Sequence, residues 1–178
     1  EAVGFKLDYA RNRMQAFIDQ MLYYARLRGA RRDYRFERLT LRSCIDEVLD
    51  DYRPLLEEKH FRVELRLADE TVFSDRRGLC FLLGQVVSNS VKYALNAPVL
   101  TFSLESNDTA TVLSIRDNGP GVPDSIKDRV FSPLVSGRDG GTGLGLTLAQ
   151  TFVQQHHGLI ELESGPGRTD FRILIPLP

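Results

Sequence analysis

The chain has 178 residues with 42 % hydrophobic content, and its 23 basic and 24 acidic residues give a formal net charge of −1. This size and composition predict a globular protein of one domain with an attached element, large enough to form a core without disulfides or metals. Because the charges nearly cancel, we expect no overall field that would attract nucleic acid or an acidic membrane. From the absence of a signal-peptide pattern or a long apolar run in these residues, we also expect this part of the protein not to cross a bilayer.

The first predicted element is a long helix over residues 5–27, followed by a possible stop at Gly29. Its apolar residues alternate spacings of three and four, the pattern of a coiled coil, and they are Leu7, Ala10, Met14, Phe17, Met21 and Tyr24. Further apolar residues at Ile18, Leu22 and Ala25 widen this stripe. We expect the helix to pack in a dimeric bundle, the alternative being that it packs on its own domain.

A polar, arginine-rich segment follows, and beyond it helical and strand patterns alternate. We expect helices at 41–56, 75–94 and 144–156, with a short one near 125–130, and strands at 61–67, 99–105, 111–117, 159–163 and 170–177. This order predicts an α+β fold: a two-layer sandwich of a mixed, mostly antiparallel sheet covered by helices on one face, preceded by one long coiled-coil-type helix. The expected division is 1–29 for the first helix, 30–38 for a linker and 39–178 for the main domain.

Two glycine-rich stretches are candidates for ligand binding. Residues 117–121 (DNGPG) follow a strand, so a carboxylate lies where a loop opens, and the glycines allow a ligand to approach the backbone. Residues 141–146 (GTGLGL) begin a helix, where free backbone N–H groups form an anion site suited to phosphates. The second stretch has neither the Lys-Ser/Thr of a P-loop nor the context of a dinucleotide-binding fold.

A third motif lies on the predicted helix 75–94. Gln85, Asn89 and Lys92 occupy positions i, i+4 and i+7, which places them on one polar face. An amide oxygen suits Mg²⁺ and an ammonium suits phosphate oxygens. Without the other two motifs, the same face would be interpreted as a solvated helix surface.

In chain order, the Asn-containing helix, Asp-x-Gly-x-Gly, Phe131 and Gly-x-Gly-x-Gly resemble the ATP-binding fold shared by histidine kinases, gyrase, heat-shock chaperone ATPases and mismatch-repair ATPases. The resemblance covers residues 39–178. Within that superfamily, residues 89–93 (NSVKY) and 165–171 (GPGRTDF) look like sensor histidine kinases of two-component systems.

For the metal and the phosphates, the resemblance implies that Asn89 holds Mg²⁺, that Lys92 contacts a phosphate and that Tyr93 lies beside the nucleotide. Asn89 and Lys92 are the implied catalytic residues. The implied triphosphate cradle consists of Gly141, Thr142, Gly143, Leu144, Gly145 and Leu146. Arg138, in an implied lid at 132–140, is a candidate contact of the γ-phosphate or, alternatively, a surface arginine.

For the base, the resemblance implies that Asp117 accepts a hydrogen bond from the adenine amino group, which selects ATP over GTP. Gly119 and Gly121 would admit the base, and Thr169 would reach it through water. Phe131 would anchor the start of the lid.

The implied activity is ATP-dependent protein-histidine kinase activity: transfer of the γ-phosphoryl group to a histidine and then to a response regulator receiver domain. The histidines of the chain, His60, His156 and His157, lack the acidic neighbour of a phosphoacceptor. Residues 1–29 therefore resemble the second helix of a dimerisation bundle whose acceptor helix is absent, and we expect no self-phosphorylation by this chain. We expect a homodimer through the helical region, no nucleic-acid partner, and a cytoplasmic location within a cell-membrane sensor whose membrane segments are outside this chain.

Two other functions are considered. The first is an ATP-gated conformational ATPase of the gyrase or chaperone class, which the amide Gln85 disfavours because it cannot act as a general base. The second is a non-catalytic nucleotide-binding dimerisation module. The sub-family stays open, because residues 9–34 resemble kinases of the bacitracin-response type, whereas residues 133–141 resemble the lid of nitrogen-regulation kinases.

Overall fold

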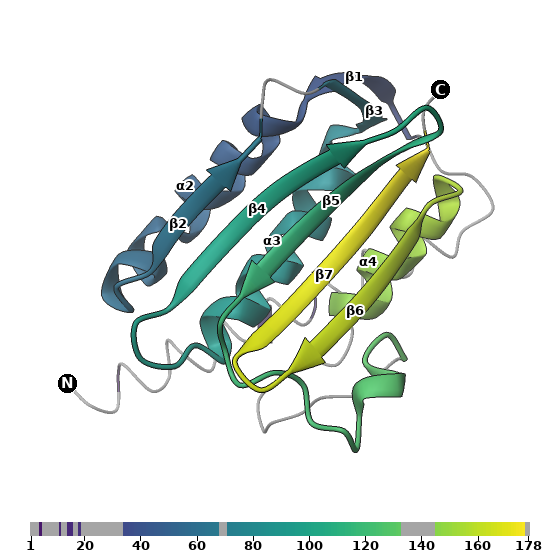
Figure 1. Ribbon diagram of the computed structural model, residues 1–178. Coiled ribbons are helices and arrows are strands. Elements are labelled where there is room, and N and C mark those ends of the chain that lie inside the picture. Colours follow the sequence, from purple (N-terminus) through teal and green to yellow (C-terminus); the bar gives the residue numbers. More distant parts are fainter. Residues whose placement is uncertain are drawn as a thin grey trace.

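The computed structural model describes residues 34–67, 71–132 and 145–176 (Figure 1). Of the preceding segment it describes only Gly4, Arg11, Met14, Gln15 and Ile18, which are helical and exposed. The predicted coiled-coil-type helix at 5–27 otherwise lies outside the described residues. In the described part of the chain, no helix is long and apolar enough to cross a membrane.

The main sheet has five strands in the order β2-β4-β5-β7-β6 (Figure 1). They are β2 (Arg62–Arg66), β4 (Val99–Ser106), β5 (Ala110–Asp117), β7 (Arg168–Pro176) and β6 (Leu159–Gly165). Only the β2–β4 pair is parallel, and the other neighbours in this sheet are antiparallel. The prediction of a mixed, mostly antiparallel sheet is confirmed.

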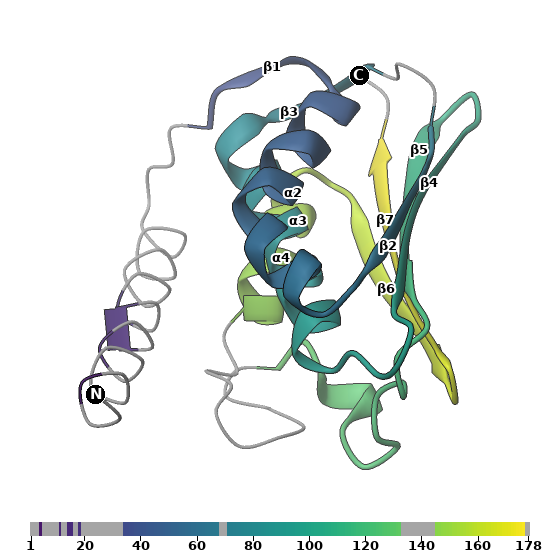
Figure 2. The same cartoon turned by 90° about the vertical axis from the view of Figure 1, so that its left-hand side faces the viewer.

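Three helices form the second layer, on one face of this sheet (Figure 2). They are α2 (Leu41–Glu58), α3 (Arg76–Lys92) and α4 (Gly145–Gln155). A short 3-10 helix, η1 (Lys127–Arg129), lies where the sequence predicts a helix near 125–130. The α+β two-layer arrangement therefore agrees with the periodicities in the sequence.

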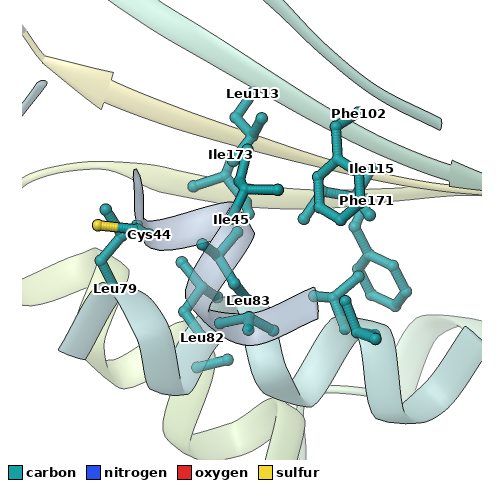
Figure 3. Close-up of a cluster of buried hydrophobic side chains, with 14 of the residues drawn as sticks. Cys44, Ile45, Leu79, Leu82, Leu83, Phe102, Leu113, Ile115, Phe171 and Ile173 are labelled. Atoms are coloured by element: carbon teal, nitrogen blue, oxygen red, sulfur yellow. The ribbon is translucent and has the colours of Figure 1, made fainter. Parts of the chain in front are cut away.

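The core lies between the two layers (Figure 3). Alternate residues of the central strands face the helices, so Phe102, Leu113 and Ile173 are buried on the same side of the sheet. Ile45 of α2 and Leu83 of α3 meet them from the helical layer (Figure 3). Burying a side chain of this size contributes about 1.5–3 kcal/mol, and this packing holds α3 against the sheet.

A second, two-stranded sheet was not predicted. It pairs β1 (Phe36–Thr40) antiparallel to β3 (Thr71–Asp75). Residues 36–38, which we expected in the linker, therefore lie in β1. Each strand has five residues, β1 exposes all of them but Leu39, and the one paired position buried on both strands is Leu39 opposite Val72. Such short strands have too little alternation to be recognised before their pairing is known.

Asp75 joins this small sheet to α3. One carboxylate oxygen accepts the Gly78 backbone N–H at 2.8 Å, which caps the helix. The other accepts the backbone N–H of Arg35 at 2.8 Å. A side chain oxygen at an N-cap satisfies a helix donor that would otherwise be free. The same residue thus begins α3 and fixes the chain that enters β1.

Candidate functional site

Asp117 is at the end of β5 and faces the helical layer. Its Oδ2 accepts a hydrogen bond from the Ser90 hydroxyl of α3 at 2.7 Å, and its Oδ1 accepts the Gly119 backbone N–H at 2.9 Å. Burial raises the pKa of the Asp117 carboxyl, while the hydrogen bonds from Ser90 and Gly119 lower it. Two donors from different elements therefore hold a partly desolvated carboxylate, with a second lone pair left on each oxygen.

The glycines after Asp117 are required by close contacts. A Cβ on Gly119 would lie 2.9 Å from Asp117 Oδ1 and 3.4 Å from the Tyr93 carbonyl oxygen. Gly121 has a φ of +82°, and a Cβ there would lie 2.5 Å from the Gly165 carbonyl oxygen. A side chain at Gly119 would thus occupy the space in front of the carboxylate. These contacts fit a carboxylate that must stay open to a ligand.

The loop after Gly121 is fastened to the β6–β7 hairpin. The Val122 backbone N–H donates to Ser164 Oγ at 2.6 Å, and Lys127 Nζ donates to the Ser164 carbonyl oxygen at 2.8 Å. Thr169 on β7 is buried and lies directly opposite Asp117 in the strand register. The structure therefore brings together Asp117 and Thr169, which are far apart in sequence and were both predicted to contact the adenine base.

The polar face of α3 approaches the same end of the sheet. Asn89 is half-buried and directly precedes Ser90, whose hydroxyl contacts Asp117, so this turn of α3 lies beside the end of β5. Lys92, one turn further on, is exposed. Tyr93 follows the helix, and its backbone N–H bonds to the Asn89 carbonyl oxygen at 3.2 Å. The residues predicted to contact the metal, the phosphates and the base therefore lie on adjacent elements, α3 and β5.

The two ends of the segment 133–144 are tied together. Thr147 Oγ1, in the first turn of α4, donates to the Phe131 carbonyl oxygen at 2.9 Å. The Phe131 ring packs edge-on against Phe171, with centroids 6.4 Å apart. Gly145 and Leu146 are the first residues of α4 and are half-buried. The remaining residues predicted here lie outside the described part of the chain; they are Arg138, Gly141, Thr142, Gly143 and Leu144.

The chemistry available is that of binding and positioning. Asp117 offers a charged acceptor for an amine, and the helix that follows residues 141–144 has its N-terminus at this end, which favours an anion. Among the described residues, no group of three His, Cys, Asp or Glu side chains is placed to hold a metal ion.

Ser90, Thr147, Ser164 and Lys127 contribute to the site but were not assigned roles from the sequence. Ser90 stands inside the Asn-containing motif, and that is the signal that could have identified it. The other three act through contacts with residues 16 to 42 positions away in the chain, and their hydroxyl and ammonium groups have no distinguishing sequence context.

All three histidines are accounted for by the fold. His60 and His157 have φ values of 57° and 58° and are each the second residue after a helix, α2 and α4 respectively. This left-handed conformation commonly ends helices. His156 Nδ1 donates to the Phe152 carbonyl oxygen at 2.6 Å, and its Nε2 is buried without a hydrogen-bond partner. Burial lowers the pKa of the His156 imidazole. His60 and His157 thus lie at helix ends, and His156 lies in a cluster of aromatic side chains.

Residues 74–178 match the family model described as Histidine kinase-, DNA gyrase B-, and HSP90-like ATPase, and because this is more than half of the chain, the chain belongs to that family. Within it, the matched region is the ATP-binding catalytic domain of the sensor histidine kinase class. The family predicted from the three motifs is confirmed.

The curated relatives are sensor kinases. The chain is 52 % identical over 68 residues to the sensory histidine kinase/phosphatase NtrB of Vibrio alginolyticus, which covers 38 % of this chain and 19 % of NtrB. It is 28 % identical over 157 residues to the sensor histidine kinase YxdK of Bacillus subtilis, covering 84 % of this chain and 48 % of YxdK. The chain therefore spans less than half the length of these relatives.

Solved structures show the same fold. The Acinetobacter baumannii histidine kinase AdeS superposes with a TM-score of 0.86 at 22 % identity, covering 99 % of this chain and 85 % of that one. The catalytic domain of the histidine kinase ThkA gives a TM-score of 0.72 at 25 % identity, covering 80 % and 95 %. ThkA in complex with the response regulator protein TrrA gives 0.78 at 21 % identity, covering 96 % and 49 %.

Proposed function

We propose that this chain binds ATP with Mg²⁺ and, in the complete protein, transfers the γ-phosphoryl group to a histidine on an acceptor helix outside this sequence. From that histidine the phosphoryl group would pass to an aspartate of a response regulator. The observation that carries the proposal is the Asp117 carboxylate, held by Ser90 and Gly119 at the open end of β5. A carboxylate accepts a hydrogen bond from the 6-amino group of adenine, whereas guanine has an oxygen at that position.

The roles of the other residues follow from their positions. Asn89 and Lys92 extend from the same helix as Ser90, and they would hold the metal and a phosphate. When bound, Mg²⁺ would neutralise charge on the phosphates. The imidazole nitrogen of the acceptor forms the new N–P bond while the bond between the γ-phosphorus and the β,γ-bridging oxygen breaks, and ADP is released. The protein supplies positioning and charge neutralisation, because this reaction needs no covalent work from its side chains.

The arrangement of the whole protein is part of the proposal. Residues 1–29 would be the second helix of a dimerisation bundle, 30–38 a connection that continues into β1, and 39–178 the catalytic domain. A homodimer through that bundle, a response regulator as partner, and a cytoplasmic position within a membrane sensor are supported by the likeness to sensor kinases, one of them solved with a response regulator. Arg138 and residues 141–146 would contact the phosphates.

Calorimetry on Asp117→Asn tests the nucleotide assignment. A charge-assisted hydrogen bond contributes about 1.5–3 kcal/mol, so we expect ATP to bind roughly 10- to 150-fold more weakly. Asp108→Asn is the matched control, because Asp108 is an exposed aspartate in the β4–β5 turn, and it should bind ATP as the wild type does. A loss below twofold in Asp117→Asn would remove this residue from the adenine site.

Phosphotransfer to a supplied acceptor helix tests the catalytic assignment. Asn89→Ala should abolish Mg²⁺-dependent transfer while metal-free nucleotide binding falls only slightly. A variant whose metal-free binding collapses equally would make Asn89 structural. Without the acceptor helix, labelled ATP should leave no acid-labile phosphate on the chain, and label on His60, His156 or His157 would contradict the proposal.

A further inference from the structure

Ser90 occupies an unusual place for a hydroxyl, since it is on the buried side of α3 and only 4 % exposed. Its one proton is donated to Asp117 Oδ2 at 2.7 Å. A serine in a helix interior ordinarily bonds back to its own helix or faces solvent. Here the hydroxyl crosses from the helical layer to the end of β5, and its bond joins two elements that carry the site.

The bond constrains the orientation of the carboxylate. The torsion that rotates an aspartate carboxylate is broad and roughly two-fold, so a single donor leaves its plane loosely defined. Gly119 N–H holds Oδ1 at 2.9 Å from the loop, and Ser90 holds Oδ2 from α3. Two donors on opposite oxygens fix the plane, and the remaining lone pairs then have set directions.

We propose that Ser90 is a positioning residue for purine recognition: its hydroxyl orients Asp117 to accept the 6-amino group of adenine. The Ser90 hydroxyl donates its only proton to the Asp117 carboxylate. Ser90 and Asp117 therefore offer hydrogen-bond acceptors to the base, and neither can donate to the oxygen of a 6-oxo purine such as guanine. Ser90 thereby contributes to the choice of ATP over GTP without touching the base. This inference rests on the proposed function in that it requires Asp117 to contact adenine.

A nucleotide that lacks the 6-amino group can show whether Ser90 orients Asp117 for that group or only supports the structure of the site. Purine riboside 5′-triphosphate has the same phosphates, ribose and ring as ATP but no 6-amino donor. We expect Ser90→Ala to weaken ATP binding roughly three- to tenfold, the range for one intramolecular hydrogen bond. Binding of the analogue should stay within twofold of wild type. A structural defect would weaken both nucleotides alike.

The chain offers a matched control two residues earlier on α3. Ser88 is a half-buried serine that lies near the Tyr52 phenol instead of the Asp117 carboxylate. Ser88→Ala should therefore leave the ATP-to-analogue ratio unchanged. Ser90→Cys keeps the volume while weakening the donor, and it replaces Ser90→Ala if thermal unfolding shows that the alanine variant does not fold. Ser90→Thr keeps the hydroxyl and should restore the ATP-to-analogue ratio.

The outcomes distinguish this inference from the proposed function. If Ser90→Ala and Ser90→Cys leave ATP binding unchanged, or weaken ATP and the analogue equally, Ser90 is not a positioning residue. If the wild type binds ATP and the analogue with equal affinity, the adenine contact of Asp117 itself fails. A lower ATP-to-analogue ratio in Ser90→Ala, with the wild-type ratio well above one, supports both.

Discussion

The phenolic hydroxyl of Tyr34 donates a hydrogen bond to the side-chain amide oxygen of Gln155, which lies 121 residues further along the chain. The Tyr34 ring also packs edge-on against Phe152 and tilted against His156, with centroid distances of 5.9 and 5.5 Å. The segment that enters β1 is therefore attached to the C-terminal end of α4. The N-terminal end of the same helix follows the predicted phosphate loop. Helix α4 therefore connects the segment at Tyr34, which leads into β1, with the predicted nucleotide site.

Tyr34→Phe keeps the ring contacts and removes this hydrogen bond. We expect the free energy of unfolding to fall by about 0.5–1.5 kcal/mol, measured by urea denaturation. Gln155→Ala should lower the free energy of unfolding by a similar amount. The double variant should lower it by less than the sum, because both changes remove the same hydrogen bond. Gln154→Ala, at the exposed neighbouring position, is the control. Strict additivity of the two losses would show that the bond contributes nothing.

A pair of glycines in α3 gives opposite expectations for the same substitution. A Cβ on Gly78 would lie 2.0 Å from Phe152 Cε2, whereas a Cβ on Gly84 would have its nearest contact at 3.8 Å, with Tyr52. Phe152 is buried and packed against His156, with ring centroids 4.1 Å apart, so it has little room to move. Gly78→Ala should cost about 1–3 kcal/mol of stability through overpacking. Gly84→Ala should stabilise by up to about 1 kcal/mol through helix propensity, and equal effects by thermal unfolding would contradict the described packing.

Asp117 should make the nucleotide-free protein less stable at neutral pH. Folding raises the pKa of this carboxyl, chiefly by burial. Its contribution to stability is therefore present below the unfolded pKa and is lost as pH rises through the folded pKa. Asp117→Asn removes the buried charge, and its amide can accept from Gly119 and donate to the Ser90 oxygen. We expect a higher midpoint of thermal unfolding without nucleotide at pH 7, and a lower midpoint would contradict this reasoning.

The same raised pKa predicts how adenine recognition depends on pH. The ionised carboxylate is the stronger acceptor, so the preference for ATP over purine riboside 5′-triphosphate should be constant at neutral pH and decline on acidification. Because burial raises the pKa of Asp117, the decline should begin at a higher pH than for an exposed aspartate. Calorimetry with both nucleotides measures this, since phosphate titration affects them alike. In Ser90→Ala the decline should move to still higher pH, and a ratio independent of pH would show that the carboxylate charge is not used.

Local patterns were sufficient to predict the five-stranded sheet and the helices above it. The strands β4 and β5 and the helix α3 have strong periodicities, and each element carries enough apolar residues to determine its own buried face. The candidate nucleotide motifs could also be recognised in the sequence. Glycines that let a ligand approach the backbone, and an Asn and a Lys three positions apart on a helix, are both short-range features. Asp117, Thr169 and Asn89 were predicted from motifs alone as nucleotide- or metal-binding residues, and the structure places them at one end of the sandwich.

The remaining features depend on residues that are distant in sequence. The strand β1 exists because β3 pairs with it, and neither has an independent hydrophobic pattern. The bond from Ser90 to Asp117 crosses 27 positions and that from Tyr34 to Gln155 crosses 121. The helices, the strands of the main sheet and the candidate ligand loops could be predicted from sequence, because periodicity and glycine placement act over a few residues. The donors to the Asp117 carboxylate and the contacts that attach Tyr34 to α4 could not be predicted in this way. A hydrogen bond between distant residues has no local sequence pattern and forms only when packing brings its partners together.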